Sequence, residues 1–362
     1  NYFGGVVLLR FFLLIIVSLL LAACSAQDSN IKEAKKTMTR DNAVSMIKNL
    51  EVPWSITKMK NTFYISERKG TIVSFNETNR KMERLIVKTN QSIHQEGESG
   101  LLGIELTPNF SESQQAYAYH TYYENDKILN RVIIIQKNKD SWNEVKVLLE
   151  EIPGSTIHNG GRLKIGPDQK LYVTIGDAAV PENAQKLNSL SGKIIRMELD
   201  GSIPKDNPFR DSYVFSFGHR NVQGLTWNEK GDMYGTEHGQ SAHDEVNHII
   251  AGHNYGWPII EGDETREGLE SPFFQTGNIT WAPSGIDYKN GKIYIATLRG
   301  EAIRELNLDT SRVTTIAEDY GRLRDVLIDG ENVYFISNNL DGRGSPSKHD
   351  DQLWKIDLSA LQ

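Results

Sequence analysis

The chain contains a single cysteine among its 362 residues, Cys24, so no internal disulfide bond can form and no Cys-x-x-Cys-His haem motif is present. Basic residues are outnumbered by acidic ones, 40 against 47, and the net charge is −7. A nucleic acid is therefore excluded as the main partner, because a phosphate backbone requires a basic surface. A hydrophobic share of 38% is typical of a soluble globular protein, although no long amphipathic helical pattern occurs.

The one long apolar run lies near the N-terminus and indicates an export signal. It follows Arg10, covers Phe11–Leu21 and ends in Ala22-Ala23-Cys24. A basic residue, a short apolar core and a small-residue exit are typical of a secretory signal, and the run is short for a membrane span. Because Leu21 to Cys24 resemble the bacterial lipobox, we expect a lipoprotein signal peptide over residues 1–23. Its alternative is a plain signal anchor. We expect an exported protein, attached through a lipid on Cys24 to the outer or periplasmic face of a bacterial membrane.

Composition then divides the chain into a tether and one folded domain. Residues 24–45 are mostly polar and charged, so we expect a lipidated cysteine followed by a flexible tether. Residues 46–362 repeat a short strand pattern. A turn comes first, and it is followed by an apolar residue, usually a tyrosine, and then another apolar or small residue. The copies are Thr62–Ser66, Ala116–His120, Lys170–Thr174, Asp232–Thr236, Lys292–Ala296 and Asn332–Ser337.

A second strand with alternating character follows most of these copies. The clearest examples are Thr71–Phe75, Arg131–Gln136, Lys193–Leu199, Ala302–Leu308 and Gln352–Leu358. Six similar units at spacings of roughly 40 to 60 residues predict an all-β fold, a six-bladed β-propeller of four-stranded antiparallel sheets. The alternative is an irregular β-sandwich, which would not need six alike units. A propeller gathers its functional loops at one mouth of a central channel.

Two polar stretches contain candidate catalytic residues. His158 precedes a Gly-Gly turn, and Asp177 follows the next strand. A histidine with a nearby carboxylate is the usual arrangement of a general base near neutral pH. Arg220 and Asn221 stand side by side before a further strand, where an arginine could polarise a carbonyl that gains negative charge. A surface histidine and a loop salt bridge are the alternatives.

Two further stretches suit a metal ion and an anion. Thr236–Asn247 combines carboxylates with a Gly-containing turn, which are hard oxygen ligands of the kind that Ca²⁺ takes, whereas zinc through His238 and His243 is the alternative. Arg322 and Arg324 point to the same side of a strand, so they suit a ligand with several carboxylates or phosphates unless Asp325 and similar residues pair with them.

Taken in order, these stretches resemble the soluble glucose and aldose sugar dehydrogenases that depend on pyrroloquinoline quinone (PQQ). The resemblance covers nearly all of the chain after the tether, and the family fold is a six-bladed propeller. The stretches that carry it are Leu50–Trp54, Glu98–Gly103, His158–Asp168, Gly218–Gly224, Asn254–Pro258, Ala282–Gly285 and Arg322–Val326.

The resemblance implies a role for each matching residue. His158 would take the proton of the anomeric hydroxyl as hydride passes to the quinone, Asp177 would orient it, and Arg220 would polarise the quinone carbonyl. Glu98 would face the substrate beside the cofactor. The remaining cofactor-binding residues would be Asn221, Thr280, Arg299, Arg322 and Arg324. The carbonyls of Gly239 and Gln240 would hold the Ca²⁺ that binds PQQ, and Glu245 with the Tyr255 carbonyl would hold a second, structural Ca²⁺.

The chain departs from the glucose enzymes at three positions. Gln240 replaces a proline, His238 replaces a glutamine, and Ile157 replaces a polar residue before the base. The implied reaction is oxidation of a small aldose to its lactone. The alternatives are a propeller that only binds partners and a calcium-dependent lactone hydrolase, which would have no clear use for the paired arginines. The sequence does not identify the sugar, the electron acceptor or the oligomeric state.

Overall fold

The computed structural model describes residues 37–361, which belong to one compact unit, Ala34–Gln362. The expected signal peptide, Cys24 and most of the expected tether lie outside the described residues. Contacts with the folded unit begin before the expected boundary at residue 46. Met38 is buried and forms a bridge with Ala317, and strand β1 (Val44–Ile47) belongs to a sheet. The folded unit therefore includes the last residues assigned to the tether.

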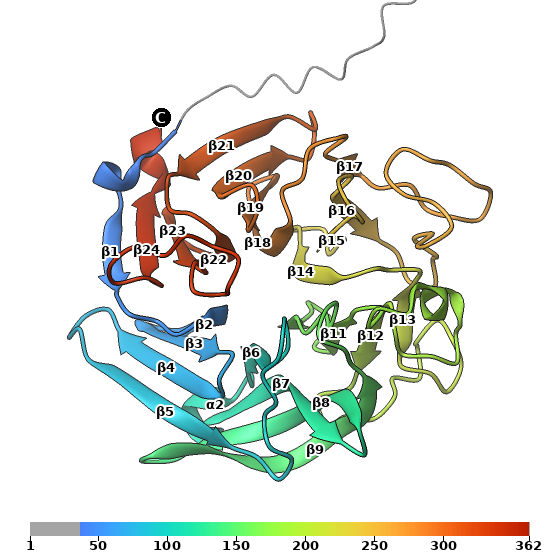
Figure 1. The fold of residues 1–362 in the computed structure, drawn as a ribbon, viewed down its shortest axis with the longest axis horizontal. Helices are drawn as coiled ribbons and strands as arrows, with labels where there is room; N and C mark the ends of the chain where they lie inside the picture. The colour runs from blue at the N-terminus through green and yellow to red at the C-terminus, as the bar shows by residue number, and fades with distance from the viewer. Residues whose placement is uncertain (1–36, 362) are drawn as a thin grey trace, which may run out of the picture. The chain divides into compact units, whose positions relative to one another are not determined.

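Four four-stranded sheets and one eight-stranded sheet surround a common centre (Figure 1). The third quarter of the chain supplies β10 (Leu163–Ile165), β11 (Leu171–Ile175), β12 (Lys193–Met197), β13 (Val214–Phe217), β14 (Val222–Trp227), β15 (Met233–Glu237), β16 (Glu245–Ile249) and β17 (Phe274–Gln275). The last part supplies β18 (Pro283–Lys289), β19 (Lys292–Thr297), β20 (Ala302–Asn307), β21 (Val313–Glu318), β22 (Leu323–Asp329), β23 (Asn332–Ser337) and β24 (Leu353–Asp357).

The eight-stranded sheet consists of two antiparallel runs that join at their outer strands. The first run contains β2 (Pro53–Met59), β3 (Thr62–Glu67), β4 (Thr71–Asn76) and β5 (Met82–Lys88). The second contains β6 (Leu101–Leu106), β7 (Gln115–Glu124), β8 (Lys127–Lys137) and β9 (Ser141–Pro153). β5 pairs with β9 in parallel from Ile86↔Ser141 to Lys88↔Asn143, which satisfies backbone groups on two edges that would otherwise be open. The hydrogen bonding confirms an all-β fold but gives five sheets, not six separate ones.

Helices are short throughout the described part of the chain. They are the α-helix α2 (Phe110–Ser113) and the 3₁₀ helices η1 (Arg40–Asn42), η2 (Pro181–Gln185) and η3 (Leu358–Leu361). Over residues 37–361, none of them is long and apolar enough to cross a membrane.

The six tyrosine-containing copies occupy equivalent places in the fold. Each is the second strand of a four-stranded run, namely β3, β7, β11, β15, β19 and β23. These strands are buried almost without interruption, because sheets or loops cover both of their faces, and this explains why they lack a polar alternation. Apolar clusters fill the spaces between neighbouring sheets, as where the Phe63 ring of β3 lies 4.7 Å from the Tyr334 ring of β23.

The N-terminal strand closes the ring. β1 completes the last sheet by antiparallel pairing with β24, from Val44↔Lys355 to Ile47↔Leu353. The two ends of the folded unit are therefore hydrogen-bonded to each other, and β1 takes the place of β24 as the outer strand of the last sheet. This closure holds the first and last sheets in fixed positions around the centre, where the candidate site lies.

Candidate functional site

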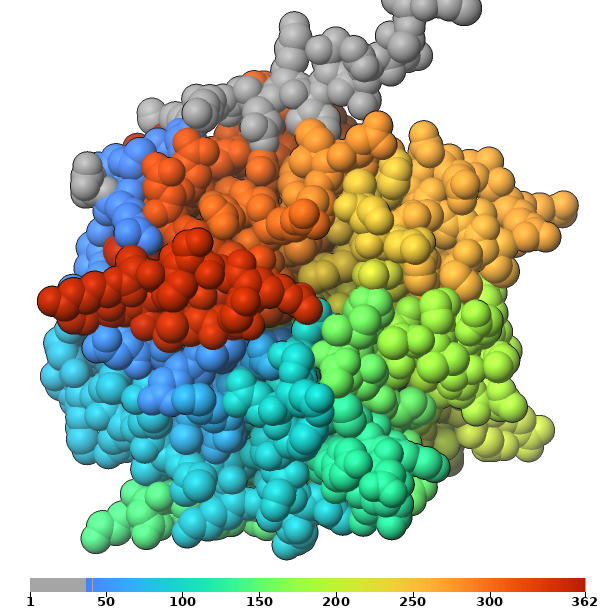
Figure 2. Space-filling model, in the orientation of Figure 1, coloured from blue at the N-terminus to red at the C-terminus, as the bar shows by residue number. Residues whose placement is uncertain are grey.

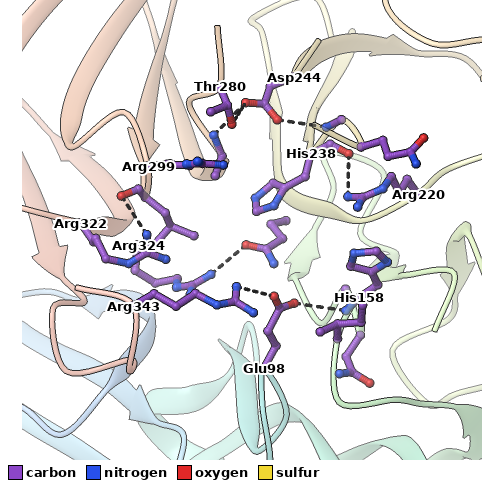
Figure 3. Close-up of a pocket in the computed structure, with 18 of the residues that line it drawn as sticks. Glu98, His158, Arg220, His238, Asp244, Thr280, Arg299, Arg322, Arg324 and Arg343 are labelled. Carbon is purple, nitrogen blue, oxygen red and sulfur yellow. Dashed lines mark hydrogen bonds and ion pairs between the residues drawn. The ribbon is translucent and has the colours of Figure 1, made fainter. Parts of the chain in front are cut away.

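A cavity of about 500 Å³ lies at the centre of the ring, and side chains from several sheets point into it (Figure 3). Most of the residues expected from the sequence line it: Glu98, His158, Arg220, Gly239, Gln240, Thr280, Arg299, Arg322 and Arg324. Asp177 and Asn221 lie directly behind its wall, because they hydrogen-bond to His158 and Gly160.

The strand order explains why these distant residues meet. The first strand of each run lies nearest the centre (Figure 1), so the loop that enters this strand opens at the mouth. Glu98, Arg220 and Thr280 come within three residues of the start of β6, β14 and β18, and His158 lies in the loop before β10. Arg322 immediately precedes β22. The same kind of connection thus delivers a functional segment in five of the six runs.

His158 and Asp177 form a hydrogen-bonded pair on the cavity wall. The His158 Nδ1 atom lies 2.8 Å from Asp177 Oδ1, and the Asp177 side chain is almost completely buried. The carboxylate also accepts hydrogen bonds from the Ala179 backbone and, through Oδ2, from the indole of Trp257. Because Nδ1 donates to a carboxylate, Nε2 is the nitrogen that remains able to accept a proton. The arrangement is that of an oriented general base.

The arginines differ in how their charges are balanced. Arg322 pairs with Asp341, with its Nη2 atom 2.8 Å from Oδ2. Arg324 donates instead to neutral oxygens of Asn338 and Gln223, and no carboxylate ion pair is recorded for it among the described residues. Burial lowers the pKa of Arg324 to about 9. The cavity therefore has a buried cationic group that an anionic ligand would stabilise.

Asp325 does not neutralise the paired arginines. It belongs to the same strand, but its Oδ2 atom lies 2.7 Å from Nη1 of Arg162 and also accepts the Ile56 backbone N–H. The alternation along β22 turns Asp325 away from Arg322 and Arg324. The alternative in which Asp325 pairs with these arginines is therefore wrong, although another carboxylate, Asp341, does pair with Arg322.

Several buried polar atoms around the cavity have no partner among the described residues. They are Nε of Arg220, Nδ2 of Asn221 and Nε2 of His238. Buried polar groups in folded proteins are almost always hydrogen-bonded, so such atoms indicate a missing ligand or water. Burial also lowers the pKa of His238 to about 4, so this imidazole is neutral at pH 7 and can donate or accept one hydrogen bond. The set fits a flat ligand with carbonyl and carboxylate oxygens.

Sequence reasoning missed Arg343, which reaches the cavity from the loop between β23 and β24. Its Nη1 atom lies 2.7 Å from Oε1 of Glu98, while Oε2 of Glu98 accepts the His158 backbone N–H at 3.1 Å. Burial alone would raise the pKa of Glu98, but the bond to Arg343 and its charge lower it to about 2. Figure 2 shows the C-terminal part of the chain, in red, reaching the middle of the face, which agrees with this contact. The only sequence signal is an arginine between two glycines.

Asp244 was also missed as an organising residue. Its carboxylate accepts backbone N–H groups of Gly239 at 3.0 Å, Trp281 at 2.6 Å and Ala282 at 2.8 Å, together with the Thr280 hydroxyl at 3.2 Å. It therefore holds the turn at Gly239 against the loop that carries Thr280. Its position inside an acidic stretch made it look like a metal ligand rather than a backbone anchor.

The four expected calcium ligands were assigned to two separate sites, and only one of these pairs lines the cavity. Gly239 and Gln240 line the cavity, whereas Glu245 and Tyr255 are not among the lining residues. Burial and the neighbouring Glu237 raise the pKa of Glu245 to about 8, and the Oδ1 atom of Asn247 has no partner in the described chain. A cation would relieve both features, so this second place fits a Ca²⁺ ion.

The zinc alternative gains no support. No group of three or more histidine, cysteine, aspartate or glutamate side chains able to hold a metal occurs in residues 37–361. His238 faces the cavity, whereas His243 packs against Gly262. Backbone carbonyls, as proposed for calcium, are a different kind of ligand from this side-chain set.

The fold and the site together define a class of all-β enzyme. Its central cavity is lined by arginines and has a histidine–aspartate pair on its wall. Comparison with known proteins agrees with this class. The profile of the glucose/sorbosone dehydrogenase family matches residues 50–345, and the chain belongs to that family.

Individual relatives point the same way. The chain is 34% identical over 239 residues to quinoprotein glucose dehydrogenase B of Acinetobacter calcoaceticus, an alignment that covers 58% of this chain and 50% of that protein. It is 27% identical to an aldose sugar dehydrogenase of Escherichia coli, over 64% of this chain and 71% of that protein. The PQQ-bound aldose sugar dehydrogenase of Streptomyces coelicolor superposes with a TM-score of 0.81 at 33% identity, covering 87% of this chain and 96% of that one.

Proposed function

We propose that this protein oxidises an aldose at its anomeric carbon to the lactone, with PQQ and Ca²⁺ as cofactors. The observation that carries the proposal is the His158–Asp177 pair, 2.8 Å apart, on the wall of a cavity that five arginines line. The family membership and the PQQ-bound relative support it. A hydrolase would use the histidine but not the arginines, and a binding module would need neither.

The residues of this chain supply base chemistry and charge. Oxidation of the C1–OH group to the lactone carbonyl removes one proton and one hydride. The Nε2 atom of His158 accepts the hydroxyl proton, and Asp177 stabilises the imidazolium that results. The quinone, when bound, supplies the two-electron acceptor for the hydride. Arg220 places positive charge where negative charge develops on an acceptor oxygen.

The arginine cluster matches the charge of the cofactor. PQQ is planar and carries three carboxylates. Arg322 and Arg343 already pair with Asp341 and Glu98, whereas Arg220, Arg299 and Arg324 form no ion pair with a carboxylate within residues 37–361. These three cations suit a ligand with several carboxylates, and Asn221 and Thr280 add neutral hydrogen-bonding groups.

We propose two calcium sites: one at the carbonyls of Gly239 and Gln240, the other at Glu245 and the Tyr255 carbonyl. The raised pKa of Glu245 and the unpartnered amide oxygen of Asn247 support the second. Titration of apo protein with Ca²⁺ in a thermal melt should raise the midpoint. Glu245→Gln should remove most of that rise without PQQ, because a structural site is independent of the cofactor. An unchanged response in this variant would contradict the assignment.

We also propose that the architecture is a six-bladed propeller. The two runs of the eight-stranded sheet would count as separate blades, because only three parallel residue pairs between β5 and β9 connect them. The six tyrosine strands, each second in its run, support this count.

Reconstitution tests the activity. The soluble part from Ser25 onward is mixed with PQQ and Ca²⁺, and bleaching of an artificial electron dye is followed with a panel of aldoses. We expect turnover that requires both cofactors and a lactone product in equal amount to the reduced dye. Absence of PQQ binding would reject the proposal. Binding of PQQ without oxidation of any sugar would leave a binding module.

We propose in addition that the protein is exported and anchored through an acyl chain on Cys24, on the grounds of its signal-like N-terminus. Cells that express the full chain and grow with a labelled fatty acid should incorporate label into the protein. The matched control is Cys24→Ala, which should lose the label while the propeller domain still folds. Label in the control variant would contradict the anchor.

A further inference from the structure

Trp257 contacts Arg220 and Asp177, the carboxylate that orients the proposed base, although it donates no group to the chemistry. Its indole Nε1–H donates to Asp177 Oδ2 at 2.9 Å, on the carboxylate that holds His158. The guanidinium carbon of Arg220 lies 5.4 Å from the centre of its ring, within the range of a cation–π contact. One side chain thus contacts the proposed electrophile and the carboxylate that orients the proposed base.

The backbone of Trp257 is itself fixed at two points. Its N–H donates to the Gly218 carbonyl at 2.9 Å, and its carbonyl accepts from Nε2 of Gln185 at 2.7 Å. Gly218 lies two residues before Arg220, and Gln185 ends η2. The indole therefore stands on a rigid base, so its direction is set by the fold rather than by the ligand.

The Asp177 carboxylate depends on this indole. Oδ1 accepts from His158 and from the Ala179 backbone, while Oδ2 accepts from Trp257. Asp177 is buried, so loss of the indole N–H would leave Oδ2 without its recorded partner and would free the carboxylate to rotate. A rotated carboxylate would no longer hold Nδ1 of His158, and Nε2 would lose its fixed direction.

We propose that Trp257 is a positioning residue that holds Asp177, and through it His158, together with Arg220 in the geometry required for reaction. The expected effects on kcat and KM rest on the proposed oxidation. The geometric part concerns residues of this chain alone and can be measured in the apo protein. Trp257 is half-buried and lines a second, adjoining cavity of about 450 Å³, together with His158, Asp177 and Arg220.

Trp257→Phe removes the indole N–H donor but keeps an aromatic ring beside Arg220, so it tests the hydrogen bond to Asp177 alone. We expect kcat to fall by about 10- to 100-fold, the usual cost of losing an outer-shell partner, while the sugar KM and the PQQ affinity stay within about twofold. Trp257→Leu, which also removes the surface under Arg220, should lose more. Trp227→Phe is the matched control, because Trp227 lies at the end of β14 and is not among the lining residues of the cavity.

A double-mutant cycle identifies the route of the effect. In an Asp177→Asn background, Trp257→Phe should reduce kcat by less than about twofold, because the partner that it fixes is already altered. Full additivity of the two losses would overturn the inference. If Trp257→Phe does not fold, Trp257→His, which keeps a ring N–H donor, takes its place and should retain more activity than Trp257→Leu.

Nuclear magnetic resonance of apo protein labelled in histidine gives a readout independent of activity. The Nδ1–H signal of His158, identified by its loss in His158→Ala, should shift or broaden in Trp257→Phe and not in Trp227→Phe. An unchanged signal together with unchanged kcat would overturn the inference. If wild-type protein oxidises no aldose but the signal moves as expected, the proposed oxidation fails and the positioning role stands.

Discussion

Arg343 and Glu98 form an ion pair of 2.7 Å that links the loop after β23 to the segment before β6. The same carboxylate receives the backbone N–H of His158, so three separate parts of the chain meet at one side chain. Two residues earlier, Asp341 pairs with Arg322. A single short loop therefore supplies a cation to one cavity carboxylate and an anion to one cavity arginine.

Arg343→Gln should raise the pKa of Glu98 from about 2 towards or above its ordinary value of 4.5, because burial persists after the counter-ion is lost. In wild-type protein the carboxylate stays charged across pH 5 to 8, whereas the variant should take up a proton as the pH falls through this pKa. Carbon-13 titration of the Glu98 carboxyl, assigned with Glu98→Gln, measures it.

The same pKa shift determines how the stability of the folded protein depends on pH. A depressed carboxyl pKa stabilises the folded protein above about pH 4.5, and this contribution disappears as the pH falls towards 2. Wild-type protein should therefore exceed Arg343→Gln in thermal midpoint at pH 7, and the difference should shrink below about pH 4.5 and disappear near pH 2. Arg210→Gln, at a fully exposed arginine, is the control and should show no such difference. A difference that stays constant with pH would contradict the assigned pair.

His158→Ala should abolish sugar oxidation and leave PQQ bound, because the residue accepts a proton and carries no charge that the cofactor requires. We expect kcat to fall by at least about 10²-fold, the lower range for removal of a general base. PQQ affinity from an absorbance titration should stay within about threefold. Full activity in this variant would exclude His158 as the base, and loss of PQQ binding would move it to the cofactor site.

The sequence predicted the six buried tyrosine strands, because a strand that is buried on both faces has an apolar pattern that is visible in the sequence alone. Polar stretches between strands indicated His158, Arg220 and the paired arginines, whereas Glu98 and Thr280 were expected only from the resemblance to the sugar dehydrogenases. The sequence did not predict the parallel pairing of β5 with β9, because these two outer strands are far apart in the sequence. Arg343 was missed because a Gly-Arg-Gly segment has no periodicity, and its partner Glu98 lies 245 residues away.

Arg324→Gln should weaken PQQ binding more than it weakens the sugar KM. Its guanidinium is held by Asn338 and Gln223, and its positive charge has no recorded carboxylate partner in the described chain. Loss of a charge-assisted hydrogen bond of about 1.5–3 kcal/mol corresponds to roughly a 10- to 150-fold lower PQQ affinity. Saturating PQQ should then restore much of kcat.

The control for Arg324 is again Arg210→Gln, which removes the same charge from an exposed position. It should leave the PQQ affinity unchanged, because salt screens the charge of an exposed side chain that does not line the cavity. Equal weakening in both variants would mean that net charge, and not a specific contact, attracts the anion. In that case added salt would reduce binding in wild-type protein and in both variants alike.

Asp325 ties the centre of the ring together, and its substitution should destabilise the fold rather than alter the site chemistry. Its Oδ2 atom accepts from Nη1 of Arg162 at 2.7 Å and from the Ile56 backbone at 2.9 Å, so it connects β22, β2 and the segment before β10. Arg162 also stacks on Trp54, with its guanidinium carbon 4.4 Å from the ring centre. Both members of the ion pair are buried.

Asp325→Asn keeps the size of the side chain and removes its charge, which leaves the Arg162 guanidinium buried without a counter-ion. Breaking a buried pair in this way costs about 3–5 kcal/mol of unfolding free energy. Denaturant unfolding of apo protein measures it. The double variant Asp325→Asn with Arg162→Gln should recover part of the loss, because it removes the unpaired charge as well. A single variant as stable as wild type would mean that the three inner segments are held in place by apolar packing alone.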